Sequence, residues 1–153
     1  MQKRSAFTLI EVLIVVVIMA VLAATIIPQF ASSTDDAKAS ALKFNLHSFR
    51  EQIEVYKLQH NGSPPTINAS SLQGLIYATN SSGVSNGVTT PDATHTLGPY
   101  IQGGGLPPNP YDGKNTVSQT AVFPPTATTA AGGWLYEPTS GQIAANTAGH
   151  LTD

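Results

Sequence analysis

An unbroken apolar run near the start of the chain limits what it can fold into more than any other feature. The run extends from Phe7 to Ile27 and is built largely from Val, Ile, Leu and Ala. As an α-helix it would measure about 31 Å, close to the ~30 Å hydrocarbon core of a bilayer. Because lipid offers no hydrogen-bond partners to the backbone, we predict a helix here despite the many β-branched residues.

Two positive charges, on Lys3 and Arg4, lie in the short leader before this run. They predict that the N-terminal flank stays in the cytoplasm and that the rest of the chain is exported. A cleavable secretory signal is the alternative, with a small-residue cleavage site near Ala23 or Ala24. Glu11 argues against it, because a carboxylate inside an apolar segment is costly and usually functional. We therefore predict a retained helix that lies in membrane lipid.

Glu11 and Phe7 are four positions apart, so a helix covering both would place them on one face. A cut between Ala6 and Phe7 would create an α-amino group near this carboxylate. In an assembly, the amine of one subunit could neutralise Glu11 of its neighbour, and the pairing would be stronger in a low-dielectric bundle than in water.

The sequence Phe7-Thr-Leu-Ile-Glu11 behind a basic leader resembles the N-terminal signal of type IV pilins and type II secretion pseudopilins. The resemblance implies that a prepilin peptidase cuts between Ala6 and Phe7, that Phe7 is then N-methylated, and that Glu11 guides assembly. Ala6 departs from the family, which usually has Gly before the cut. Pro28 matches the family's helix-loosening proline. We predict a kink there within one long helix, the alternative being the first turn of a second helix.

An amphipathic continuation of the helix is predicted for residues 31–62, after the leader (1–6) and the transmembrane and assembly helix (7–30). Apolar residues recur there at alternating spacings of four and three, which is the helical period; they are Leu42, Leu46, Phe49, Ile53 and Tyr56. The stripe could be a coiled-coil seam, but it spans only two heptads. We favour a face on which a small domain packs.

Residues 63–153 predict a small globular head rich in Gly and Pro. We expect a short helix over residues 70–79, a strand over 116–123, and a hairpin of 133–136 and 142–145 joined by 137–141. The predicted class is α+β: a long N-terminal helix, half of it transmembrane, packed against a small antiparallel sheet with Pro/Gly-rich loops. Residues 98–101, 106–111 and 132–143 are similar to the globular part of major pseudopilins, so the fold is expected to be pilin-like.

Composition excludes several functions. The chain has no cysteine, so neither a disulfide nor a thiolate site can form. Its net charge of −2 gives no basic field for nucleic acid, and only 10% of residues are charged, against roughly 25% in typical soluble domains. No catalytic motif is present, so we expect no enzymatic activity and no catalytic residue.

Calcium is the one cofactor that the resemblance suggests, because major pseudopilins often hold it in a late, Asp-rich loop. Here the late loops offer Asp112 and Glu137 as candidate ligands. Calcium needs six to eight oxygens, usually including several carboxylates. We expect no bound metal and assign both residues to turns.

The function implied by the resemblance is that of a structural subunit of a type II secretion pseudopilus. Its expected partners are copies of itself in a homopolymeric helical filament, a prepilin peptidase, an inner-membrane assembly platform and minor pseudopilins. It would span the inner membrane once, with a cytoplasmic N-terminus and a periplasmic C-terminal domain, and then enter a periplasmic or surface filament.

Two alternatives remain. The first is a type IV pilus subunit for adhesion, motility or DNA uptake, although the lack of a cysteine pair is unlike a typical adhesive pilin. The second is a soluble exported binding module behind a cleavable signal.

Overall fold

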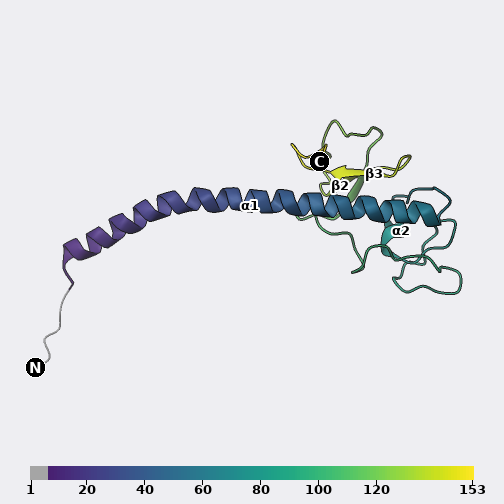
Figure 1. Cartoon of the computed structure of the whole chain (residues 1–153), viewed down its shortest axis with the longest axis horizontal. Helices are drawn as coiled ribbons and strands as arrows, with labels where there is room; N and C mark the ends of the chain where they lie inside the picture. The colour runs from purple at the N-terminus through teal and green to yellow at the C-terminus, as the bar shows by residue number, and fades with distance from the viewer. Residues whose placement is uncertain (1–6) are drawn as a thin grey trace, which may run out of the picture. The chain divides into compact units, whose positions relative to one another are not determined.

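A computed structural model describes residues 7–153, except the side chains at positions 28 and 30–32. The elements are, in order, helix α1 (Leu9–Gln59), helix α2 (Gln73–Ile76) and strands β1 (Val117–Gln119), β2 (Trp134–Glu137) and β3 (Gln142–Ala145) (Figure 1). The chain forms two compact units, divided between Lys38 and Ala39. The leader, with Ala6 at its end, lies outside the described residues. The predicted α+β class is confirmed.

The first unit contains the N-terminal part of α1. The backbone is helical on both sides of Pro28 and through it, so Pro28 does not begin a second helix. A kink at this position stays a prediction. The apolar side chains of this part are exposed, and no other element of the unit covers them.

The second unit is built around the rest of α1. Every residue of the predicted apolar stripe is at most 3% exposed, so the stripe is confirmed as a packing face. Phe49 meets Trp134 of β2 edge to face, with ring centroids 4.9 Å apart. Tyr136 and Ile143 of the sheet belong to the same buried cluster.

Helix α1 ends after Gln59, at the sequence His60-Asn-Gly62. Asn61 adopts a left-handed conformation with φ 55°, and the Gly62 N–H donates to the carbonyl of Lys57 at 2.8 Å. This is the Schellman arrangement, which satisfies a carbonyl that the helix leaves unpaired at its end.

The sheet is mixed rather than purely antiparallel, which corrects the sequence prediction. Strand β1 runs parallel to β2, with Val117 opposite Trp134, and β2 pairs with β3 antiparallel, with Glu137 opposite Gln142. Parallel neighbours need a crossover connection, and residues 120–133 provide one.

Three predicted element boundaries are also too wide. The hairpin connection is 138–141 because Glu137 belongs to β2, strand β1 is confined to Val117–Gln119, and α2 is a single short turn at Gln73–Ile76. Leu72 and Leu75 are nevertheless buried with Ile76.

Proline-rich loops are tied to the sheet by hydrogen bonds from large side chains. The Trp134 indole N–H donates to the carbonyl of Pro107 at 3.0 Å, and the Tyr136 hydroxyl donates to that of Pro65 at 2.8 Å. Buried Asn109 donates to the carbonyl of Gly133 at 2.8 Å. These bonds give irregular backbone the partners that a buried loop needs.

Candidate assembly and processing site

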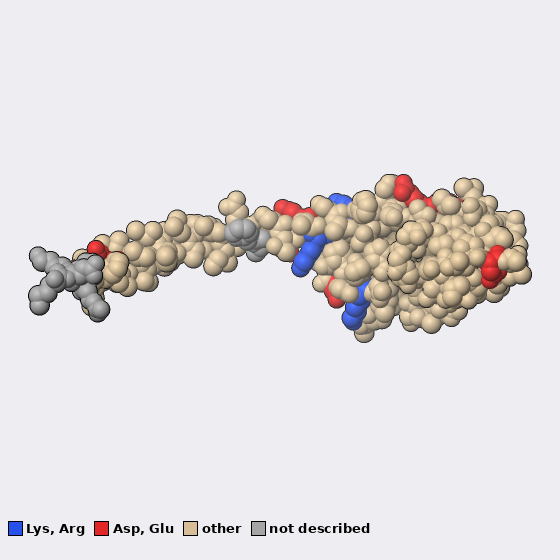
Figure 2. Space-filling model, turned by 90° about the horizontal axis from the view of Figure 1, so that it is seen from below, with Lys and Arg blue, Asp and Glu red and all other residues tan. Residues whose placement is uncertain are grey.

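The N-terminal half of α1 presents a continuous apolar surface. Residues Leu9–Ile27 have a mean hydropathy of 3.0, and among the described residues they form the one helix long and apolar enough to cross a membrane. Figure 2 draws this part almost entirely in tan, and Glu11 is its one ionisable side chain. A cleavable secretory signal has a similar composition, so Glu11 and the processing site must distinguish a retained membrane helix from such a signal.

Thr8 and Glu11 form a capping box at the start of α1. The Glu11 carboxylate oxygen Oε2 accepts hydrogen bonds from the Thr8 N–H and the Thr8 hydroxyl, both at 2.8 Å. In return, Thr8 Oγ1 accepts from the Glu11 N–H at 3.4 Å. The two residues therefore satisfy donors that a helix N-terminus leaves unpaired.

This role of Glu11 is absent from our sequence prediction, although the sequence carries its signal. Thr8-Leu-Ile-Glu11 has the Thr-x-x-Glu spacing of a capping box directly before an apolar run. The pattern places Thr8 in the candidate site as the residue that positions the Glu11 carboxylate.

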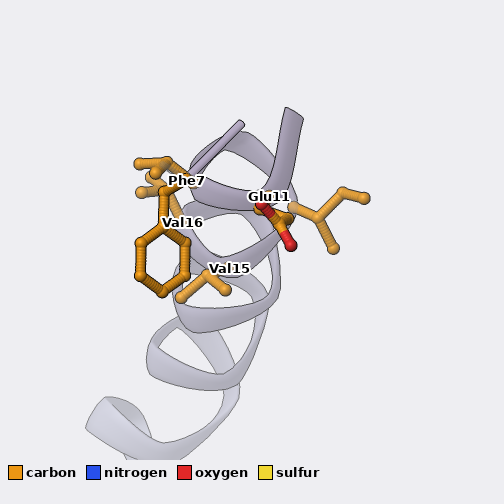
Figure 3. A pocket seen from close by; sticks show the side chains of 6 residues that line it. Phe7, Glu11, Val15 and Val16 are labelled. Atoms are coloured by element: carbon orange, nitrogen blue, oxygen red, sulfur yellow. The ribbon is translucent and has the colours of Figure 1, made fainter. Parts of the chain in front are cut away.

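Phe7 precedes the first helical residue and is 86% exposed. In Figure 3 the ring lies beside Val15 and Val16, whereas the Glu11 carboxylate projects from another side of the helix. Phe7 itself lies before the first helical residue, yet Phe7 and Glu11 line one apolar depression, so their shared helix face stays a prediction.

A shallow apolar depression lies along this part of the helix, lined by Phe7, Glu11, Val12, Ile14, Val15 and Val16 (Figure 3). One continuous segment, residues 7–16, supplies all six lining residues, so the depression has no opposing wall. It is a surface to be covered by lipid or by another helix rather than a cavity for a small ligand.

Asp112 and Glu137, the two candidate calcium ligands, each hold a separate turn. Asp112 accepts from the Gly133 N–H at 2.7 Å and from the Lys114 N–H at 2.9 Å. Glu137 accepts from the Ser140 hydroxyl and the Ser140 N–H, each at 2.7 Å, and from the Thr139 N–H at 2.8 Å. These bonds, led by that from the Ser140 hydroxyl, lower the pKa of Glu137 to about 2.

This donor set does not fit a calcium site. Calcium needs six to eight oxygens, and both carboxylates already serve backbone N–H groups of different turns. Within residues 7–153, no group of three or more His, Asp or Glu side chains comes together in a way that could hold a metal ion.

Residues 1–27 match a family model described as the prokaryotic N-terminal methylation motif. The chain is also similar to curated proteins named type II secretion system core protein G. Identity to that of Pseudomonas aeruginosa is 41% over 68 residues, covering 43% of this chain and 48% of the relative. For the Klebsiella pneumoniae protein the identity is 31% over 78 residues, covering 51% of this chain and 54% of the relative. For the Vibrio cholerae protein the identity is 30% over 66 residues, covering 43% of this chain and 45% of the relative.

The chain spans about half the length of the curated relatives it matches. No solved structure matches it. The predicted resemblance to pilins and pseudopilins is confirmed by the motif and by these relatives.

Proposed function

We propose that this chain, which carries the N-terminal methylation motif and resembles type II secretion core protein G, is a structural subunit of a type II secretion pseudopilus. One observation carries the proposal: the methylation motif, over residues 1–27, contains an exposed apolar helix with a single carboxylate near its start. The role is architectural rather than enzymatic.

The apolar surface of α1 must be covered both before and after assembly. A newly made subunit would place it in the inner membrane, with the N-terminus cytoplasmic and the head periplasmic. In the filament, the same surface would pack against copies of itself. Helix association in lipid depends on close packing and polar contacts rather than on apolar burial, which gives Glu11 its importance.

Glu11 is suited to direct this packing. Its Oε2 is held by Thr8, whereas Oε1 has no hydrogen-bond partner among residues 7–153. Cleavage between Ala6 and Phe7 would free an amine, and that amine, methylated on Phe7, would pair with the Glu11 of a neighbouring subunit. The pairing would neutralise two charges that would otherwise be isolated in a low-dielectric bundle.

Membrane insertion, cleavage and assembly each imply a further partner. A prepilin peptidase would process the chain, an inner-membrane assembly platform would extract it from the lipid, and minor pseudopilins would accompany it in the filament. Pro28 would loosen the helix as the subunit changes environment, because proline removes one helical hydrogen bond.

Mass spectrometry of the mature N-terminus tests the proposal. In cells with a prepilin peptidase we expect a chain that starts at N-methylated Phe7, and in cells without the peptidase a chain that retains its leader. A mature start near Ala24 or Thr25 would show an ordinary secretory signal and overturn the proposal.

A complementation experiment separates a pseudopilus from a pilus. The gene should restore protein secretion to a type II secretion strain that lacks its core protein G, with the Glu11→Val variant as the matched control. Failure there, together with restored pili in a pilin-deficient type IV pilus strain, would favour the pilus alternative.

A further inference from the structure

A small pocket lies beside the C-terminal end of α1, far along the chain from the assembly segment. It encloses about 250 Å³ and lies within the second unit. Neutral hydroxyl and amide side chains contribute to its lining; they are Asn61, Ser63, Thr66, Ser81 and Ser82. No Asp, Glu, Lys or Arg lines it.

Tyr56 brings an unpaired hydroxyl to this pocket. The residue is 3% exposed, yet its hydroxyl has no hydrogen-bond partner in the described part of the chain. By contrast, the hydroxyl of buried Tyr136 donates to Pro65. Among the described residues, no side-chain polar atom is both sealed from solvent and unpaired. The Tyr56 hydroxyl therefore reaches accessible space, and the pocket provides it.

Gly83 approaches the Tyr56 hydroxyl closely at the edge of the pocket. A Cβ at this residue would lie 2.6 Å from the Tyr56 hydroxyl oxygen, which is a steric clash. Gly83 also has φ +79°, which favours glycine. Any other side chain at position 83 would therefore push against the Tyr56 hydroxyl.

The wall behind the hydroxyl is held in place. The His60 ring stacks on Tyr56 with centroids 3.7 Å apart and planes 10° apart. Nδ1 of His60 lies 2.8 Å from the carbonyl of Tyr56, and Nε2 lies 3.1 Å from the Thr79 hydroxyl. Both ring nitrogens are therefore used within the protein, and His60 shapes the pocket. A preformed wall lowers the entropic cost of binding.

The lining identifies the kind of ligand. Hydroxyls donate and accept hydrogen bonds, so they complement a molecule that carries several hydroxyls of its own. The volume is below the roughly 300–1,000 Å³ of pockets for drug-sized ligands. We propose that this pocket binds a neutral polyhydroxylated molecule the size of a monosaccharide, either free or as the end unit of a polysaccharide.

Ligand-detected NMR on the full-length protein tests this inference. The protein should be kept in lauryldimethylamine oxide micelles, because detergents with sugar head groups would compete for the pocket. The probes are D-glucose and N-acetyl-D-glucosamine, with D-glucuronate as a charged probe of similar size. We expect saturation transfer to at least one neutral sugar, with a dissociation constant of about 1–10 mM at ordinary ligand efficiency.

Tyr56→Phe is the deciding variant because it removes only the unpaired hydroxyl. It should weaken sugar binding about fivefold or more while leaving the unfolding temperature unchanged or higher. Tyr100→Phe is the matched control. The Tyr100 hydroxyl donates to Gln59 at 2.7 Å, and Tyr100 does not line the pocket, so sugar binding should persist.

Three results would overturn the inference: no transfer to either neutral sugar at 20 mM, equal binding by the Tyr56→Phe variant, or equal binding of glucuronate. Comparing N-acetylglucosamine with its trisaccharide distinguishes the two sources, since tighter binding of the trisaccharide indicates a polysaccharide end. Binding is measured without assembly, so its failure would leave the proposed pseudopilus function untouched.

Discussion

Glu11 has a partner in its own helix before any neighbouring subunit is present. Its carboxylate accepts two hydrogen bonds from Thr8, which reduces the cost of carrying a charge into lipid. A neighbouring amine would add a third donor at the opposite oxygen. In the proposed function, the same carboxylate would thus serve a subunit in the membrane and a subunit in the filament.

Substitution of Glu11 tests its part in assembly. Glu11→Val should leave cleavage before Phe7 and membrane insertion largely intact, because the apolar run becomes longer. It should reduce filament yield roughly tenfold, the scale of one lost charge pair. Glu11→Gln, which keeps the shape but removes the charge, should behave similarly. Filament yield can be measured by shearing and immunoblotting, and a normal yield from Glu11→Val would refute the electrostatic role.

Thr8 should act through Glu11 and through the first helical turn. Thr8→Val is nearly isosteric but removes the hydroxyl, so it loses one of the two bonds to Oε2 and the acceptor for the Glu11 N–H. We expect amide hydrogen exchange at Leu9–Val12 in micelles to become about two- to fivefold faster. Thr8→Ser retains the hydroxyl and should exchange like the wild type. Equal hydrogen-exchange rates in the Thr8→Val and Thr8→Ser variants would argue against the capping box.

Glu137 should make the head sensitive to acid. Its pKa is about 2 in the folded chain against an ordinary 4.5, so the unfolded state binds more protons between these values. Its contribution to stability is complete above about pH 4.5 and is lost as the pH falls towards 2. The unfolding temperature should therefore fall over this window. Glu137→Gln should flatten the pH dependence of the unfolding temperature. An unchanged pH dependence in this variant would contradict its assignment to Glu137.

At the level of elements, the buried stripe of α1 should dominate head stability. Phe49 is 1% exposed and packs on Trp134, so Phe49→Ala should cost about 3–5 kcal/mol. Phe44 lies on the same helix but is 73% exposed, so Phe44→Ala should cost less than about 1 kcal/mol. Denaturant unfolding followed through Trp134 fluorescence compares the two. Similar losses would mean that Phe44 is covered by something other than solvent.

The helix was the most predictable element because its signals are local. The apolar run, the stripe spacing and the His60-Asn-Gly62 ending are all readable over a few turns of sequence, and the stripe is buried as expected. The Thr8 cap was equally local and could have been predicted from its spacing to Glu11. The face shared by Phe7 and Glu11 stays a prediction, because the helix begins only at Leu9.

The sheet was less predictable because its pairing is not local. The β2–β3 hairpin follows from two apolar segments around a turn. The parallel β1–β2 pair instead depends on residues 120–133 carrying the chain across, and nothing in their Thr-, Ala- and Pro-rich sequence specifies direction. The hydrogen bond from the Gly133 N–H to Asp112 likewise joins residues that only the folded head brings together.

For the whole molecule, the two units meet different requirements. The head has its own buried core and satisfies its loops internally, whereas the N-terminal part of α1 exposes its large apolar side chains. With no disulfide to stabilise it, the head depends on packing and on side chains that bond to its turns. This division predicts that head stability is independent of both assembly and metal.

Metal removal tests the second part of that prediction. Asp112 and Glu137 already accept bonds from backbone N–H groups, so neither 1 mM calcium nor EDTA should shift the unfolding temperature by more than about 1 °C. Asp112→Asn should lower that temperature equally with calcium and with EDTA, because the residue acts through Gly133 and Lys114. A rise of several degrees with calcium, abolished by Asp112→Asn, would show instead that the late loops rearrange into a metal site.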